Sequence, residues 1–334
     1  MLARLQQALT LGVLAASLGW AAWFIRQGRP LAAVGGALLL LFGYALFLAL
    51  EFLLLAWQHR DDSAPRATAR QLLHAWWGEA LTAPQVFCWR QPFRARAVPD
   101  HLPAAASGRG VVLVHGFVCN RGFWNPWMTE LRARGVPFIA VDLEPVFGSI
   151  DHYADCVGAA VQRLTLATGR APLIVAHSMG GLAVRLWWAS TGAGTPVEHI
   201  VTIGSPHSGT WLARFGPTLN GRQMRRGGAW LGELEATERR LRGASPYERF
   251  TCFYSHSDNI VFPASTATLP GADNRHVDGC AHVHLAFQPA VFDEALRWLA
   301  PTEGAGARVS ADGRSPGGCR PRARQPGRRG GRSE

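Results

Sequence analysis

One serine stands between an apolar run and a run with helical spacing in the stretch LIVAHSMGGLAVRLWW, residues 173–188. The apolar run 172–176 is typical of a buried parallel strand, and residues 182–188 can continue as a helix. Ser178 would then lie on the sharp turn between them, with its hydroxyl exposed. The stretch predicts a nucleophilic serine, with an ordinary glycine-rich turn as the alternative for these residues alone.

The residues around this serine suit such a turn. Ala176, Gly180 and Gly181 are small, as the close approach of strand and helix requires. The amide of Met179 would lie at a helix N-terminus, where it can stabilise a developing oxyanion.

A serine hydroxyl is a weak nucleophile unless a base removes its proton, and that base is normally a histidine oriented by a carboxylate. Downstream of Ser178, Asp258 follows a strand-like run. A later loop holds His282 and His284. The chain therefore offers candidates for both partners after the serine.

Five short motifs occur in one order along the chain. They are VVLVHGF (111–117), AHSMGG (176–181), TIGSPHSGT (202–210), SDNIVFP (257–263) and GCAH (279–282). With these motifs the chain resembles the lipase and esterase branch of the alpha/beta-hydrolase superfamily, over residues 85–300. The resemblance implies an alpha/beta-hydrolase fold with a doubly wound, mostly parallel sheet, and catalytic residues in the chain order serine, acid, histidine.

Carried over residue by residue, the resemblance assigns Ser178 as the nucleophile, Asp258 as the orienting carboxylate and His282 as the base. His284 is the alternative base. It follows two residues later, and its side chain would point the other way in an extended segment.

The resemblance also assigns the oxyanion hole to the backbone amides of Phe117 and Met179. Gly116 permits the close approach of the backbone there, and His115 is expected to brace the loop. The resemblance implies no metal and no organic cofactor.

Strand-like and helix-like runs alternate along the chain, which predicts the parallel sheet that must position these residues. The strand candidates are residues 85–89, 111–115, 137–143, 172–176, 199–204 and 250–254. The helix candidates are residues 127–134, 150–168, 178–190 and 291–299.

Two uncharged apolar segments, residues 9–25 and 31–50, are each close to the roughly 20 residues that cross a bilayer. We expect two transmembrane helices in a hairpin, with a cleaved signal peptide as the alternative for the first. Glu51 would lie at the membrane interface, at the end of the second span. We therefore expect an integral protein of the cell membrane. The number of arginines on the outer flanks of the two spans favours a cytoplasmic position for the hydrolase domain.

The expected organisation has four parts. Residues 1–58 form the transmembrane hairpin, 59–84 a juxtamembrane amphipathic helix, 85–300 the hydrolase domain and 301–334 a disordered tail rich in Arg, Gly and Pro. Within the domain, residues 211–245 are expected to form a cap, either an apolar lid or a helical excursion packed on the domain.

The 334-residue chain has a formal net charge of +11 and contains no lysine. Much of that charge belongs to the arginines of the tail, where no aromatic residues are interleaved, so nucleic acid is not an expected partner. The six cysteines are scattered, without a C-x-x-C pair or a zinc spacing. The expected partners are the lipid membrane and an ester substrate.

Together these features predict a membrane-anchored serine hydrolase that cleaves carboxylic esters through an acyl-serine intermediate. Phe123, Trp124 and Trp127 are expected to narrow the cleft and to favour a hydrophobic acyl chain. An acyltransferase or thioesterase with the same triad is the alternative, and a non-catalytic membrane scaffold is a third hypothesis.

Overall fold

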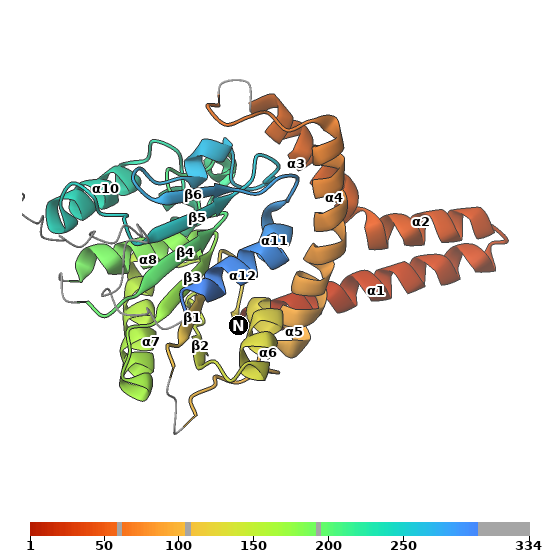
Figure 1. The fold of residues 1–334 in the computed structure, drawn as a ribbon. Helices are drawn as coiled ribbons and strands as arrows, with labels where there is room; N and C mark the ends of the chain where they lie inside the picture. Colours follow the sequence, from red (N-terminus) through yellow and green to blue (C-terminus); the bar gives the residue numbers. More distant parts are fainter. Residues whose placement is uncertain (59–61, 104–107, 192–194, 300–334) are drawn as a thin grey trace, which may run out of the picture. The chain divides into compact units, whose positions relative to one another are not determined.

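A six-stranded sheet organises the segment 85–299, called here the α/β part. The structure is a computed structural model that describes residues 1–58, 62–103, 108–191 and 195–299 (Figure 1). The expected disordered tail, residues 301–334, lies outside the described residues. The strand order is β2-β1-β3-β4-β5-β6, and every neighbouring pair is parallel.

The five strands β1 to β5 lie where the sequence predicts them, whereas the predicted strand at residues 85–89 is absent and β6 is additional. The strands are β1 (Val111–Val114), β2 (Phe138–Ala140), β3 (Leu173–His177), β4 (His199–Ile203), β5 (Phe250–Tyr254) and β6 (Asp273–His276). The first four and most of β5 are buried, as expected for a parallel sheet with both faces covered. β6 was not expected, because this edge strand is polar and largely exposed.

Alternate residues of the five strands β1 to β5 pack into two apolar cores on opposite faces of the sheet. In β1, Val112 and Val114 belong to the first core, whereas Val111 and Leu113 belong to the second. Helices of the first core are α7 (Tyr153–Thr168) and α8 (Met179–Ser190), and those of the second are α6 (Asn125–Ala133) and α12 (Pro289–Arg297). The sheet is therefore doubly wound, as predicted.

The strand expected at residues 85–89 is wrong. These residues form the π-helical segment η2 (Gln85–Arg90), which continues from helix α4 (Ala69–Pro84) and leads into α5 (Gln91–Arg94). A short apolar run does not by itself distinguish a strand from a helical turn. Here Val86 is buried while Trp89 is exposed, so the run has one buried side.

Helix α4 is the amphipathic helix expected within residues 59–84. It begins with a capping box, in which Thr68 accepts the amide hydrogen of Gln71 and the Gln71 side chain accepts that of Thr68. Its buried face holds Ala75, Glu79 and Ala80. In Figure 1 this helix runs beside the short helix α11 (His282–Leu285).

Three further helices precede α4: α1 (Leu2–Arg26), α2 (Pro30–Phe42) and α3 (Tyr44–Gln58). Of the described helices, α1 alone is long and apolar enough to cross a membrane, a property that signal sequences share. α2 and α3 pass the same test only as a pair, bent by 51°. The second expected span is therefore not one continuous helix. The break is at Gly43, where an added Cβ would lie 2.5 Å from the carbonyl oxygen of Leu39.

The segment expected to form a cap is helical. It comprises η5 (Trp211–Phe215), α9 (Leu219–Gln223) and α10 (Ala229–Arg242). Trp211 packs edge-on against Trp57 of α3 and stacks on Phe262. Three short 3₁₀ turns complete the α/β part: η3 (Arg121–Trp124), η4 (Ile150–His152) and η6 (Ala264–Ala267).

Candidate active site

Ser178 lies on the sharp turn between β3 and α8, as the sequence predicts. Its backbone has φ 55° and ψ −131°, a conformation that non-glycine residues rarely adopt. The two glycines behind it leave room for this turn. An added Cβ at Gly180 would lie 2.5 Å from the carbonyl oxygen of His115, and one at Gly181 would lie 2.3 Å from the Ser205 hydroxyl.

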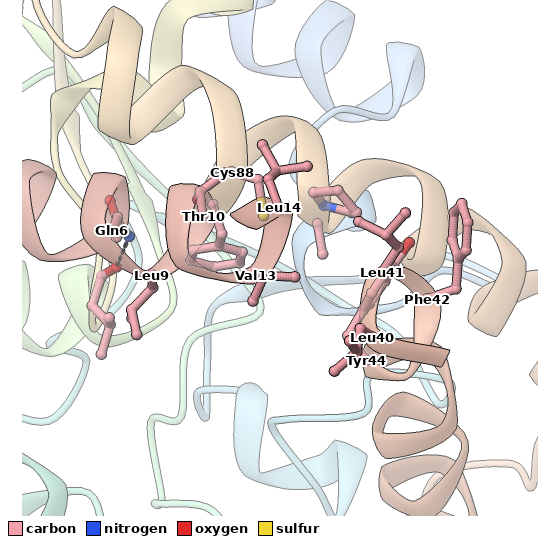
Figure 2. Close-up of a pocket in the computed structure, with 14 residues that line it drawn as sticks. Gln6, Leu9, Thr10, Val13, Leu14, Leu40, Leu41, Phe42, Tyr44 and Cys88 are labelled. Atoms are coloured by element: carbon pink, nitrogen blue, oxygen red, sulfur yellow. Dashed lines mark hydrogen bonds between the residues drawn. The ribbon is translucent and has the colours of Figure 1, made fainter. Parts of the chain in front are cut away.

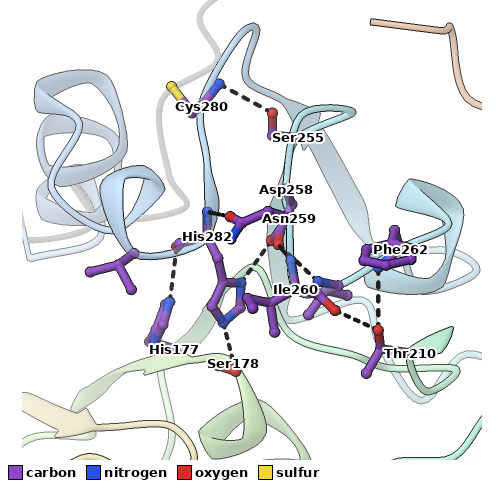
Figure 3. Close-up of polar contacts among 12 residues, drawn as sticks. His177, Ser178, Thr210, Ser255, Asp258, Asn259, Ile260, Phe262, Cys280 and His282 are labelled. Carbon is purple, nitrogen blue, oxygen red and sulfur yellow. Dashed lines mark hydrogen bonds and ion pairs between the residues drawn. The ribbon is translucent and has the colours of Figure 1, made fainter. Parts of the chain in front are cut away.

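Figure 3 shows His282 between Ser178 and Asp258. The Nε2 atom of His282 lies 2.9 Å from the Ser178 hydroxyl oxygen, and its Nδ1 atom lies 2.9 Å from Oδ2 of Asp258. With neutral histidine, Nδ1–H donates to the carboxylate and Nε2 accepts the hydroxyl hydrogen. The three residues that the resemblance selected therefore form one hydrogen-bonded chain, and all three are buried.

The Asp258 carboxylate is held on both oxygens. Its Oδ1 accepts the backbone N–H groups of Ile260 and Val261, at 2.9 and 2.8 Å, which leaves Oδ2 for the histidine. Gly204 clears the space in front of this contact, since an added Cβ there would lie 2.9 Å from Oδ2. The carboxylate can therefore fix the orientation of the imidazole ring.

The surroundings of His282 favour its protonated form. Burial opposes protonation, but the charge and hydrogen bond of Asp258 outweigh it, so the pKa of His282 is raised. The carboxylates of Glu79 and Glu51 act in the same direction. A base with these neighbours can take the serine proton and hold it as an imidazolium.

The loop after β1 lies directly against Ser178. An added Cβ at Gly116 would be 2.7 Å from the serine Cβ, so only glycine fits there. Phe117 follows, and Val118 has φ 53°, an uncommon conformation for a β-branched residue. Met179 is the first residue of α8. The two backbone positions assigned to the oxyanion hole thus flank the serine.

His115 braces this loop, as expected. Its Nε2 accepts the amide hydrogen of Leu143 at 3.0 Å, and its Nδ1 lies 2.9 Å from the carbonyl oxygen of Gly116. Burial lowers the pKa of His115, which keeps the ring neutral and suits this pair of bonds.

His177 supports the backbone of His282, a contact that no sequence pattern indicates. Its Nε2 donates to the carbonyl oxygen of His282 at 3.1 Å, and its ring stacks on Phe123. Burial, together with the nearby His282, lowers the pKa of His177 well below its ordinary value. The neutral ring therefore supports the backbone of His282 without adding a second charge.

His284, the alternative base, does not contact the serine in this structure. Its Nε2 lies 2.7 Å from the amide nitrogen of Gln288, and its ring lies against α4. Burial and the nearby His74 lower its pKa. The geometry therefore favours His282 as the base.

Two carboxylates from the N-terminal helices also reach this region, although no sequence pattern links them to it. Glu51 was expected at a membrane interface, yet its side chain is buried and accepts a hydrogen bond from Asn259. Glu79 accepts the backbone N–H groups of Val283 and His284. The only available signal was that Glu51 is a lone acid in a long apolar stretch.

Phe123, Trp124 and Trp127 are buried in the second core, whereas the sequence predicts that they narrow the substrate cleft; Trp127 also lines a small pocket between α6 and α12. The indole N–H of Trp127 donates to the carbonyl oxygen of Ala286. Their side chains pack α6 and η3 against the face of the sheet that the second core covers. The more exposed aromatic contact near the oxyanion loop is between Phe117 and Phe147.

An apolar cavity of about 630 Å³ lies between α1, the α2–α3 bend and the end of α4 (Figure 2). From the α/β part it takes Val118, next to Phe117, together with two residues of η2; Ser178, Asp258 and His282 do not line it. Its wall consists of Gln6, Leu9, Thr10, Val13, Leu14, Leu40, Leu41, Phe42, Tyr44, Ala83, Pro84, Phe87, Cys88 and Val118.

Among the described residues, His256, His276 and Asp278 bring possible metal ligands within 4.8 Å of one another. Nε2 of His276 accepts the amide hydrogen of His256, and its Nδ1 lies 3.3 Å from Oδ1 of Asp278.

The chain belongs to the alpha/beta hydrolase family, whose model matches residues 111–310. It is similar to the Bacillus licheniformis lipase BlEst2 in its propeptide form, with 17% identity and a TM-score of 0.51, over 61% of this chain and 52% of that one. Aspergillus fumigatus lipase B matches with 20% identity and a TM-score of 0.48, over 60% and 55% of the two chains.

The mature form of BlEst2 matches with 17% identity and a TM-score of 0.48, over 58% of this chain and 95% of that one. The match thus spans about half the length of the propeptide form and of the Aspergillus lipase. A comparison with curated protein sequences finds no match. At this level of identity the structural likeness concerns the fold.

Proposed function

We propose that this protein is a serine hydrolase that cleaves carboxylic esters through an acyl-serine intermediate. The observation that carries the proposal is the hydrogen-bonded chain from Ser178 through His282 to Asp258, with 2.9 Å at each contact. Membership of the alpha/beta hydrolase family supports it. A non-catalytic scaffold protein would not need these three hydrogen-bonded residues, with the serine on a strained turn.

In the first step, the Ser178 oxygen attacks the ester carbonyl carbon while Nε2 of His282 takes the hydroxyl proton. The negative charge that develops on the carbonyl oxygen is stabilised by the amides of Met179 and Phe117. The imidazolium, held by Asp258, then gives its proton to the departing alcohol. Water repeats the sequence on the acyl-serine and releases the carboxylic acid.

Membrane anchoring is part of the proposal. α1, with the bent pair α2–α3, would form the hairpin, and most of the apolar side chains of α1 and α2 are exposed. Removal of α1 as a signal peptide is disfavoured by its contacts, since Leu2 and Gln6 are buried and Gln7 donates to the carbonyl oxygen of Pro92. The arginine distribution favours a cytoplasmic site.

A hydrophobic acyl chain is the proposed substrate feature. Membrane anchoring would keep the site near lipidic esters, and the wall of the apolar cavity includes Val118, which follows the proposed oxyanion donor Phe117. Acyl transfer to an alcohol or a thiol is the alternative use of the same acyl-serine, because the acceptor is chosen after that intermediate has formed.

The test is labelling of the detergent-solubilised full chain with a fluorophosphonate probe, followed by hydrolysis of nitrophenyl esters of increasing chain length. We expect Ser178→Ala and His282→Ala to abolish labelling and His284→Ala to retain it. Turnover should increase towards longer acyl chains. A wild-type protein that neither labels nor hydrolyses any ester would contradict the proposal.

A further inference from the structure

Glu79 of α4 caps the segment that carries the candidate base. Its carboxylate accepts the N–H of Val283 at 3.1 Å and that of His284 at 2.9 Å. These are the amides that directly follow His282, and Glu79 is 2% exposed. The first amides of a helix have no partner within it, so this side chain satisfies two donors that the helix itself leaves unpaired.

Glu51 of α3 acts on the same segment through one intermediate. Its Oε2 accepts a hydrogen from the Asn259 side chain at 2.6 Å. The other end of that amide, Oδ1 of Asn259, accepts the backbone N–H of His282 at 3.2 Å. The Glu51 carboxylate therefore fixes the orientation of the Asn259 side-chain amide. Asn259 directly follows Asp258 and in turn holds the backbone of His282.

The packing of α4 against this segment requires particular residues. An added Cβ at Gly78 would lie 2.3 Å from the ring of His284, so a larger residue there would displace that ring. One turn earlier, Nδ1 of His74 lies 3.0 Å from the carbonyl oxygen of Gly279. Figure 1 shows α4 running alongside α11. Three residues of α4 thus contact the segment 279–284 that carries His282: His74, Gly78 and Glu79.

We propose that Glu79 and Glu51 are positioning residues for His282, so that the N-terminal helices complete the active site. This inference rests on the proposed function. The carboxylates do not touch the reacting atoms; they hold the backbone of residues 282–284 and the amide of Asn259. They also place negative charge near the imidazole, in addition to Asp258.

The charge has a predictable sign. Burial raises the pKa of Glu79 to about 7, against the hydrogen bonds from its backbone partners and the nearby His282. Its ionised form raises the pKa of His282. The other groups facing the imidazole are Asp258, Glu51 and the neutral His177. Removing the Glu79 charge should therefore lower the pKa of the base.

The experiment uses the full chain in detergent, with Glu79→Gln, Glu79→Ala and Glu51→Ala. The matched control is Glu248→Gln, which changes an exposed acid outside these contacts. For each variant we measure kcat and KM for a nitrophenyl ester across pH. We also measure the pKa of His282 by hydrogen exchange at its imidazole C2, which does not depend on activity, and the thermal unfolding midpoint.

Glu79→Ala loses both acceptors, and we expect kcat to fall about 10- to 100-fold with little change in KM, as for a misplaced catalytic group. Glu79→Gln keeps an oxygen acceptor and should retain kcat within a few-fold. Its acid limb should move to lower pH, and the pKa of His282 should fall by about 0.5 or more. Glu51→Ala should lower kcat in the same way but less strongly.

Unchanged kcat in Glu79→Ala, with an unchanged pKa of His282 in Glu79→Gln, would overturn the inference and leave the proposed function intact. If Glu79→Ala does not fold, Glu79→Gln decides through the pKa and the acid limb. If the wild type has no esterase activity, the proposed function fails; the pKa of His282 in Glu79→Gln then still tests the coupling separately.

Discussion

The guanidinium of Arg185 and the carboxylate of Glu238 form a two-pronged ion pair in the interior, with N–O distances of 2.9 and 2.6 Å. Both side chains are almost wholly inaccessible to solvent. Arg185 belongs to α8, the helix that begins after Ser178, and Glu238 belongs to α10. The pair therefore joins α10 of the expected cap to the helix behind the nucleophile, which favours a packed excursion for α10.

Removing one partner of this pair should destabilise the fold. Glu238→Ala leaves the buried guanidinium without its counter-charge and takes an acceptor from the Tyr247 hydroxyl, so we expect a loss of about 3–5 kcal/mol. Glu235→Ala on the same helix breaks a more exposed pair with Arg239 and should cost less than about 1 kcal/mol. Denaturant unfolding measures both, and equal losses would contradict the prediction.

Asp258→Asn tests the orienting role of the carboxylate. The amide can still accept the N–H groups of Ile260 and Val261, but it no longer stabilises an imidazolium, so kcat should fall by about 10⁴-fold with folding retained. Asp155→Asn, an exposed acid at the start of α7, is the control and should leave kcat unchanged. Retention of more than a tenth of wild-type kcat in Asp258→Asn would argue for another mechanism.

Gly116→Ala tests the oxyanion loop. The new Cβ would lie 2.7 Å from that of Ser178, so the loop bearing Phe117 must move away. We expect kcat to fall about 10²- to 10³-fold, comparable to the loss of one oxyanion donor. Gly232→Ala provides the comparison because nothing lies within 4 Å of the added Cβ. Similar kcat values for the two variants would exclude the assigned position of the hole.

The pH dependence follows from the raised pKa of His282. Attack requires the neutral imidazole, so kcat/KM should rise with pH through that pKa and level off above it. Because the neighbouring carboxylates raise it, the midpoint should lie above the ordinary histidine value of about 6.5. A midpoint below that value, from ester hydrolysis across a buffered series, would show that burial outweighs the carboxylates.

Much of the sheet and the three residues of the hydrogen-bonded chain could be predicted, for related physical reasons. Buried parallel strands are short and continuously apolar, as in β1 and β3. The turn at Ser178 needs glycines at fixed positions next to it. Asp258 and His282 follow in the order that the fold imposes, each on a loop at the same edge of the sheet. These signals are local, so the sequence carries them.

The contacts of Glu79 and Glu51 could not be predicted in this way. Glu79 lies 204 residues before its partner Val283, and no periodicity links them. The strand predicted at residues 85–89 is wrong for a different reason. The apolar run there is a local signal, but it fits a strand and a helix equally well. The aromatic residues Phe123, Trp124 and Trp127 were assigned to a cleft because composition does not reveal which face of η3 and α6 is covered.

The bend at Gly43 would limit how far the α/β part can lie from a bilayer that holds the proposed hairpin. α2 has 13 residues, about 20 Å of helix, whereas the hydrocarbon core is about 30 Å thick, so part of α3 would have to complete such a crossing. Yet Phe52 and Leu55 of α3 are already buried against protein. With the hairpin inserted as proposed, the buried part of α3 would hold the α/β part directly against the bilayer. Such an enzyme would take its esters from the adjoining leaflet of the bilayer and not from the surrounding solution.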